Sequence, residues 1–93
     1  MELNQRRLEN GIWHLSVSGE MDLYNADEFK REIDRLFGDG DAGVIADLEG
    51  LSYIDSSGIG ALLYTITQSK ARQRGVCFVH VTGSVRKVIE LTS

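Results

Sequence analysis

The chain has 93 residues, 42% of them hydrophobic, which is enough for one small domain and excludes a second. Its formal net charge of −4 argues against the basic surface with which proteins bind nucleic acid or anionic membranes. The lone Cys77 excludes an internal disulfide, and no apolar run approaches the roughly 20 residues that span a bilayer. The first residues lack the apolar stretch of a secretory signal, so we expect a cytoplasmic domain with a protein or small-molecule partner.

The N-terminal part predicts a β-hairpin followed by a helix. Residues 2–8 and 11–18 read as strands joined by a tight Asn-Gly turn at residues 9–11, with apolar side chains alternating on one face of the second strand. A helix begins near Asn25 with acidic residues in its first turn and ends at residues 38–40. Its predicted apolar stripe consists of Ala26, Phe29, Ile33, Leu36 and Phe37.

The C-terminal part predicts a strand, a helix and a second strand. The apolar run at 44–48 is typical of a strand covered on both faces, and residues 56–73 read as a helix that Gly75 terminates. A strand at 76–81 should run parallel to strand 44–48. The expected buried stripe of the helix is Ile59, Leu62, Leu63 and Ile66, and a last helix opens at Gly83-Ser84.

These elements predict a single α/β domain over residues 1–93. The expected architecture is one mixed sheet with an N-terminal hairpin, with strands 44–48 and 76–81 central and parallel, covered by three helices. Apolar periodicity predicts burial of Trp13, Phe29, Ile45, Leu62 and Val79.

The hydrophobic period changes from strand to helix at Asp55-Ser56-Ser57. These residues therefore occupy the cap or first turn of a helix, where unpaired amide groups and the helix dipole favour anionic oxygen such as phosphate. All three are also favoured capping residues, so a purely structural role is the simpler interpretation of the motif alone. Gly58 and Gly60 are unfavourable inside a helix, which suggests either close packing on the sheet or an entrance left bare for a partner.

Residues 53–63, YIDSSGIGALL, closely resemble the signature of the STAS domain as found in bacterial anti-sigma factor antagonists. Residues 19–22, Gly-Glu-Met-Asp, are similar to a step that follows an early strand of that family, and residues 85–92 are similar to its third helix. Three matches in the same order and at shared spacings cover nearly the whole chain. The resemblance implies that Ser57, the second serine of Asp-Ser-Ser-Gly, is a phosphorylation site.

The resemblance further implies a regulatory binding module rather than an enzyme. The unphosphorylated protein would bind an anti-sigma factor that is itself a serine kinase, and so release a sigma factor for transcription. Phosphorylation of Ser57 would end the interaction, and a separate serine phosphatase would restore it. The residues expected to support the phosphosite are Asp22, Asp55, Ser56 and Gly58, with Asp22 orienting the hydroxyl or accepting its proton. The residues expected to contact the partner are Met21, Ile59, Gly60, Ala61 and Tyr64.

Two features leave alternatives within the same family. Its members commonly continue for another strand and helix beyond Thr92-Ser93, so the chain is either naturally short or cut. An edge strand missing for that reason would expose backbone groups, and a monomer or weak dimer is expected. The second alternative is a STAS module of another system, such as a stressosome-type scaffold or a component of an anion transporter or lipid-transport complex.

Two catalytic interpretations fit the sequence less well. Asp22, Asp47 and Asp55 could form a Mg²⁺-binding pocket in which an aspartate accepts phosphate, but that arrangement also needs a lysine after a later strand, and none follows strand 76–81. A hydrolase with Ser57 activated by His14 or His80 would need a Gly-x-Ser-x-Gly frame, which is absent. We therefore expect no catalytic residues, no metal and no cofactor.

Overall fold

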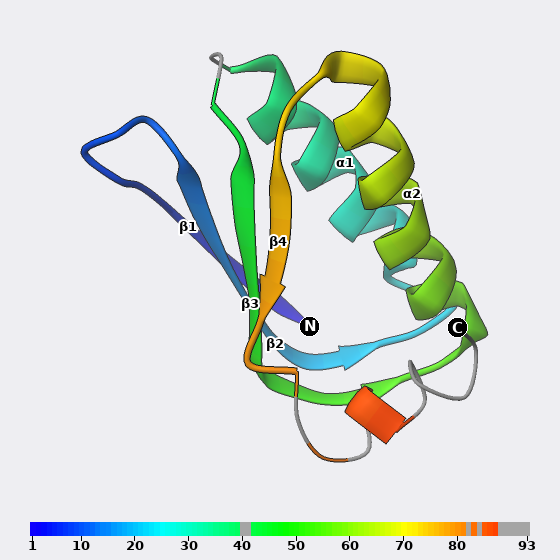
Figure 1. The fold of residues 1–93 in the computed structure, drawn as a ribbon. Helices are drawn as coiled ribbons and strands as arrows, with labels where there is room; N and C mark the ends of the chain where they lie inside the picture. Colours follow the sequence, from blue (N-terminus) through cyan, green and yellow to red (C-terminus); the bar gives the residue numbers. More distant parts are fainter. Residues whose placement is uncertain (40–41, 82, 84, 88–93) are drawn as a thin grey trace.

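The computed structural model describes residues 1–39, 42–81, 83 and 85–87 (Figure 1). Its elements in chain order are β1 (Glu2–Arg7), β2 (Trp13–Met21), α1 (Ala26–Gly38), β3 (Val44–Ile54), α2 (Ser56–Arg72) and β4 (Val76–Val79). Residues 85–87 are helical as well, and most of the last predicted helix, including Val88, Ile89 and Leu91, lies outside the described residues.

The four strands form one mixed sheet in the order β1-β2-β3-β4. Strands β1 and β2 pair antiparallel, whereas β2 with β3 and β3 with β4 pair parallel, which confirms the predicted class of fold. Strand β3 is an inner strand as predicted, but its inner neighbour is β2, and β4 is the last strand of the sheet within the described part of the chain. The reason is that α1 returns the chain so that β3 lies beside β2, with Trp13 opposite Val44.

The inner strands are longer than predicted, and the hairpin loop is wider. Strand β2 continues through Met21 instead of stopping at residue 18, and β3 continues through Ile54 instead of residue 48. Their added segments pair with each other up to Met21 opposite Ile54. Residues 8–12 connect β1 to β2 and are closed by a bond from the Leu8 amide to the Ile12 carbonyl, 2.8 Å long, so the loop is not a two-residue turn. Strand β4 ends two residues earlier than expected.

Helices α1 and α2 lie together on one side of the sheet, and the core fills the space between them and the strands (Figure 1). Phe29 and Leu62 are buried as predicted, and all five residues of the α1 stripe are buried. Trp13, Ile45 and Val79 are partly buried rather than completely buried, and Trp13 packs against the core. Ile45 lies between the buried Val44 and Ala46 and therefore faces the side of the sheet that the helices do not cover. Val79 follows Phe78, which packs against the core, and faces the same uncovered side.

Helix α2 ends one residue earlier than predicted, and its buried face agrees with the prediction only in part, because Ile59 and Leu62 are buried as expected. Leu63 is 58% exposed and Ile66 is partly exposed, contrary to prediction. Small residues take the sheet-facing positions in their place, because they let the helix approach the strands closely. The buried residues of α2 are Gly58, Ile59, Ala61, Leu62, Thr65 and Ser69. The helix ends with Gln73 in the left-handed conformation, φ 55°, two residues before the glycine that was expected to terminate it.

Candidate functional site

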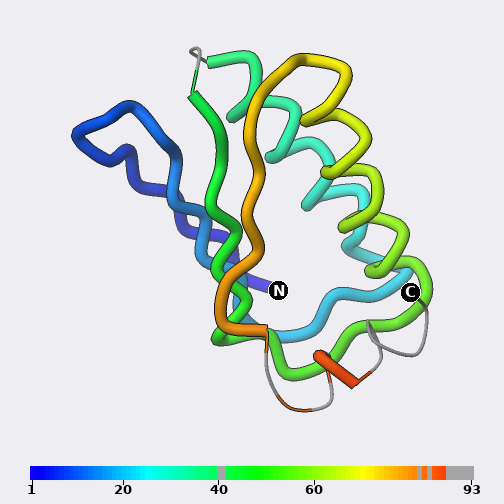
Figure 2. The backbone as a smooth tube through the Cα atoms, viewed as in Figure 1, coloured from blue at the N-terminus to red at the C-terminus, as the bar shows by residue number. Residues whose placement is uncertain are grey.

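The candidate site lies where the inner strands end. Figure 2 shows the ends of β2 and β3 running side by side toward the first turns of α1 and α2. The pairing continues one step beyond the strands, because the Asp55 amide donates to the Met21 carbonyl oxygen at 3.2 Å. The turn after β2 and the start of α2 are therefore neighbours, although more than thirty residues separate them in the sequence.

Asp55 caps α2 and also holds the turn that follows β2. Its Oδ1 accepts the amide of Gly58 at 3.0 Å, and its Oδ2 accepts the amide of Leu23 at 3.1 Å. The first bond satisfies one of the donors left unpaired at a helix start, which confirms the capping function that the sequence indicated. One carboxylate thus joins the β2–α1 turn to the helix N-terminus.

Asp22 directly follows β2, because this strand continues beyond its predicted end at residue 18. Its Oδ1 accepts the amide of Tyr24 at 2.9 Å, and its own amide donates to Asn25 Oδ1 at 2.9 Å. Asn25 in turn donates to the Glu20 carbonyl at 2.8 Å. These bonds assign Asp22 to an Asx-type turn, and no hydrogen bond between Asp22 and Ser57 occurs among the described residues.

Ser56 and Ser57 occupy the first two positions of α2. Ser56 is exposed and Ser57 is partly exposed, and within the described residues neither hydroxyl has a hydrogen-bond partner. Because Asp55 already caps the helix, neither serine is needed for that purpose. A phosphate on either hydroxyl would lie close to the positive end of the helix dipole.

The two glycines of the first helical turns have opposite surroundings. A Cβ atom at Gly58 would lie 2.5 Å from Cγ1 of Ile54 and 2.8 Å from the Met21 carbonyl oxygen, so only glycine allows this close approach of helix and strands. A Cβ atom at Gly60 would meet nothing within 4 Å. Gly58 is therefore a packing residue, whereas Gly60 leaves a bare stretch of helix surface.

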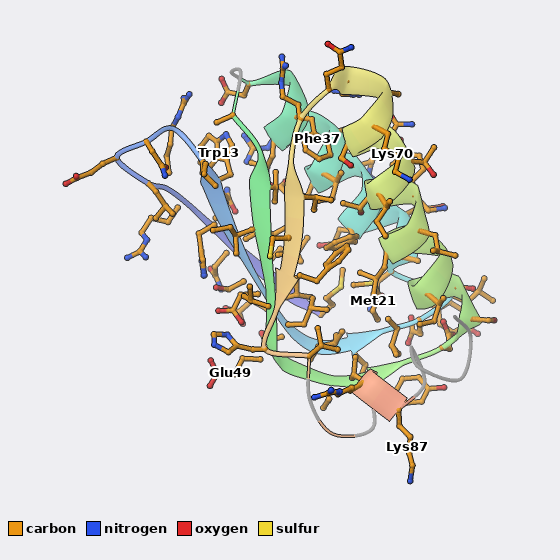
Figure 3. The ribbon with its side chains drawn as sticks, viewed as in Figure 1. Trp13, Met21, Phe37, Glu49, Lys70 and Lys87 are labelled. Atoms are coloured by element: carbon orange, nitrogen blue, oxygen red, sulfur yellow. The ribbon has the colours of Figure 1, made fainter. Side chains whose placement is uncertain are left out.

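The expected set of partner contacts needs correction. Met21 and Ala61 are completely buried and Ile59 is 9% exposed, so these side chains belong to the core. Figure 3 shows Met21 between the sheet and the helices. Tyr64 is partly buried and its hydroxyl bonds to Asp34 of α1. Of the five residues predicted, Gly60 alone is exposed.

Other large apolar side chains are exposed instead. Leu23 is 70% exposed and Tyr24 93%, in the turn that Asp55 holds at the start of α2, and Leu63, two turns further along α2, is 58% exposed. Ser56, Gly60 and Leu63 are four and three residues apart, so they share one exposed face of α2. We call the surface formed by Leu23, Tyr24, Ser56, Gly60 and Leu63 the docking rim.

The sequence contains a signal that could have predicted part of the docking rim. Leu23 and Tyr24 are two large apolar residues in a short connection between a strand and a helix, where polar residues are the rule. Leu63 gives no such signal, because its spacing fits the buried stripe of an ordinary amphipathic helix.

Neither catalytic arrangement is assembled. Asp47 lies in β3 eight residues before Asp55, which along an extended strand is on the order of 20 Å, so the two aspartates do not form one pocket. His14 and His80 both contact Asp47, at 3.3 Å and 2.9 Å, rather than Ser57. None of the helices described is long and apolar enough to cross a membrane.

The described residues form a small α/β domain that presents two serine hydroxyls without hydrogen-bond partners at the start of a helix. Residues 5–93 match the STAS domain family, and the chain belongs to this family.

Several of the similar proteins are named anti-sigma factor antagonists, whereas other similar solved structures are of an anion transporter and a sulfate transporter family protein. The anti-sigma-B factor antagonist of Staphylococcus aureus (strain NCTC 8325 / PS 47) is 25% identical over 93 residues, which cover 99% of this chain and 86% of that protein. The solved structure of an anti-sigma factor antagonist from Mycobacterium paratuberculosis is 26% identical, with a TM-score of 0.77 over 98% of this chain and 76% of that one.

The fold is also that of SpoIIAA, an anti-sigma factor antagonist of Bacillus. Its unphosphorylated form superposes with a TM-score of 0.75 at 21% identity, over 97% of this chain and 83% of that chain. Its phosphorylated form gives 0.74 at 21% identity, over 99% and 84%. Domains of this group are binding and regulatory modules, not enzymes.

Proposed function

We propose that this protein is an anti-sigma factor antagonist switched by phosphorylation of Ser57. The unphosphorylated form binds an anti-sigma factor that is also a serine kinase, and a sigma factor is thereby released. Phosphate transfer to Ser57 ends the interaction, and a serine phosphatase reverses it. The observation that carries the proposal is that Asp55, not a serine, caps α2, which leaves the Ser57 hydroxyl without a structural task at a partly exposed helix start.

The physical basis of the switch is local charge. A phosphate adds a charge of about −1.5 to −2 at neutral pH. The helix N-terminus favours that charge, so the fold itself should tolerate the modification. The exposed Leu23 and Tyr24 lie in the turn that Asp55 holds at this helix start, and a partner that covers them would have to exclude water from the phosphate as well. Phosphorylation therefore opposes docking without unfolding the domain.

The docking rim supplies the contact surface for the kinase. Apolar and aromatic side chains at the centre of an interface commonly carry most of the binding energy. The bare surface at Gly60 lets a partner approach the helix backbone, and Ser57 lies three residues before it. We further propose that the protein acts in the cytoplasm as a monomer or weak dimer.

Phosphate incorporation tests the proposal. The parent protein is used to recover its small ATP-binding serine kinase from the source cells, and the purified kinase is incubated with ATP and each variant. Ser57→Ala should abolish labelling, and mass spectrometry of the parent should place phosphate on Ser57. Because Asp55 remains as the cap, Ser57→Ala should change the free energy of unfolding by less than about 1 kcal/mol.

Ser56→Ala is the matched control, because it removes the neighbouring hydroxyl from the same helical turn. It should be labelled as the parent is. Ser57→Asp should bind the kinase more weakly than the parent, since it adds one negative charge, yet less weakly than the phosphorylated protein. Full labelling of Ser57→Ala with phosphate on Ser56 would contradict the assignment, and recovery of membrane transport components without any kinase would contradict the function.

Asp22→Asn tests the remaining proposed role of the carboxylate. Asparagine keeps the oxygen that accepts the Tyr24 amide, so the turn should persist. If the Asp22 charge orients the hydroxyl or accepts its proton, phosphorylation should slow while binding of the kinase remains close to that of the parent. An unchanged rate would remove Asp22 from the proposal and leave Ser57 unaffected.

A further inference from the structure

A second polar cluster lies on the side of the sheet that faces away from the helices. His14 of β2 places Nε2 at 3.3 Å from Oδ2 of Asp47, and His80, just after β4, places Nδ1 at 2.9 Å from Oδ1 of the same carboxylate. Oε2 of Glu49 lies 4.0 Å from the same nitrogen of His80. In Figure 3 Glu49 lies on the side of the sheet opposite to Met21 and the helices.

The cluster is held by the strands that contribute to it. Asp47 is 14% exposed at its side chain, and its Oδ1 accepts the amide of Glu49 at 3.1 Å, so its position is fixed from two sides. The Nδ1 atom of His14 lies 3.5 Å from the Ser16 hydroxyl, which directs Nε2 toward Asp47.

The cluster adjoins an open pocket between β2 and β3. The pocket has a volume of about 250 Å³ and is lined by Ser16, Val17, Ser18, Asp47, Glu49 and Gly50. An ion has access to the carboxylates from this side, and water can complete its coordination.

The donor atoms lie close enough together for one metal ion to bind them. Bonds of 2.0–2.2 Å in a tetrahedron place neighbouring ligand atoms about 3.4 Å apart. The 2.9 Å between His80 Nδ1 and Asp47 Oδ1 is a hydrogen-bond distance, so an ion would replace this bond and separate the two atoms slightly. One donor atom each from Asp47, Glu49 and His80 already lies within 4.8 Å of the other two. Glu49 is 77% exposed, so its side chain is free to rotate inward.

We propose that Asp47, Glu49 and His80 form a binding site for Zn²⁺ or a similar divalent transition metal, with His14 holding the second oxygen of Asp47. One imidazole nitrogen with two carboxylate oxygens and a water is a ligand set that zinc accepts, whereas Mg²⁺ and Ca²⁺ prefer oxygen alone. The two carboxylates together balance the charge of the ion. This site was not expected from the sequence, and it is independent of the function proposed for Ser57.

A metal ion at this position would cross-link the end of β4 to β3 and β2. An ion that binds the folded chain and not the unfolded one raises stability in proportion to the logarithm of its concentration. Because the ligands face away from the helices, the ion should leave the docking rim accessible.

Isothermal titration with Zn²⁺ tests the proposal in the full chain carrying Cys77→Ser. That background removes the exposed thiol, which could bind zinc by itself. One ion should bind per chain, Zn²⁺ should raise the melting temperature relative to EDTA, and Co²⁺ should give the intense visible absorption typical of tetrahedral coordination. Mg²⁺ should produce none of these effects.

Single substitutions locate the ion. His80→Gln, Asp47→Asn and Glu49→Gln should each weaken binding by about tenfold or more. Glu9→Gln is the matched control, since it removes an exposed carboxylate from the hairpin loop and should leave affinity unchanged. Circular dichroism of each variant in EDTA verifies that it is folded. If Asp47→Asn does not fold, His14→Gln serves as a further test of the same carboxylate. Absence of binding in the Cys77→Ser chain, or equal affinity in the folded ligand variants and Glu9→Gln, would overturn the proposal.

Discussion

The hydroxyl of Tyr64 in α2 lies 2.9 and 2.7 Å from the two carboxylate oxygens of Asp34 in α1 and donates its proton to that group. Arg72 approaches the same carboxylate at 3.4 Å, and the Lys30 ammonium lies 5.4 Å from the centre of the Tyr64 ring. Tyr64 was predicted from the sequence as a partner contact, yet its hydroxyl is engaged within the domain. Together these contacts fix the two helices relative to each other, and hence the start of α2 relative to the sheet.

Tyr64→Phe should therefore destabilise the domain by about 1 kcal/mol at neutral pH. The hydrogen bond to Asp34, partial burial and the charge of Asp34 raise the pKa of Tyr64 above its ordinary value. A raised folded-state pKa stabilises the protein below the unfolded pKa, about 10, and this contribution is lost as pH rises through the folded pKa. Urea denaturation of parent and variant should show a constant difference up to about pH 10 that shrinks above it. A difference that grows in alkali would contradict the contact.

Gly58→Ala and Gly60→Ala should have opposite effects on stability. The new Cβ at position 58 would collide with Ile54 and the Met21 backbone, and crowding of this kind typically destabilises by about 1–3 kcal/mol. At position 60 it would meet open space, and alanine should stabilise the helix by roughly 0.5–1 kcal/mol. Urea denaturation of both variants measures the contrast. Equal effects at the two positions would mean that the first turn of α2 does not pack on the strands as described.

Leu62→Ala and Leu63→Ala separate the core from the docking rim. Leu62 is 6% exposed, so its truncation should cost about 2–5 kcal/mol of stability, a large part of what so small a domain has. Leu63 is 58% exposed, and its truncation should change stability by no more than about 0.5 kcal/mol. Leu63→Ala should instead weaken binding of the kinase, by about tenfold or more if this side chain is central to the interface. The two measurements are thermal unfolding and a binding titration, and a destabilising Leu63→Ala would reverse the assigned faces.

The product of phosphorylation should be a serine ester. A phosphoserine survives mild hydroxylamine, whereas an aspartyl phosphate is an acyl phosphate and does not. Radiolabelled protein should therefore keep its label after hydroxylamine treatment, and a small acyl-phosphate donor with Mg²⁺ should transfer nothing. Loss of label would point to an aspartate and against Ser57.

The pattern of apolar residues predicted the order of the helices and strands, because each buried face produces a regular spacing of apolar residues along the sequence. The five buried residues of α1 repeat at helical spacing, and Asp55 stands at the change of period as a favoured cap residue. The ends of β2 and β3 gave no such signal, since exposed residues such as Glu20 and Tyr53 interrupt the apolar run. Backbone pairing between the two strands, which no local pattern reports, extends them to Met21 and Ile54.

The sequence did not predict the complete buried face of α2 or the histidine–carboxylate cluster, and the reason differs between the two. Periodicity weighs large side chains, so it assigned Leu63 to the core and overlooked Ala61, although close approach to the sheet favours small residues. The contact between His80 and Asp47 joins residues 33 positions apart. It depends on the register of β3 against β4 and on which face each side chain takes, and a shift of one residue would reverse that face.

Because Asp55 holds the β2–α1 turn against the start of α2, the proposed phosphate acceptor and the proposed partner contacts are separate side chains on one rigid part of the fold. Leu23, Tyr24 and Leu63 are exposed and are not part of the buried core, so they are free to change in shape and size without altering Ser57 or its helix. Duplicated copies of such a domain could therefore acquire different partners while keeping the same on–off chemistry. In a cell with several such pathways, each copy would then bind its own partner and not the partners of the other copies.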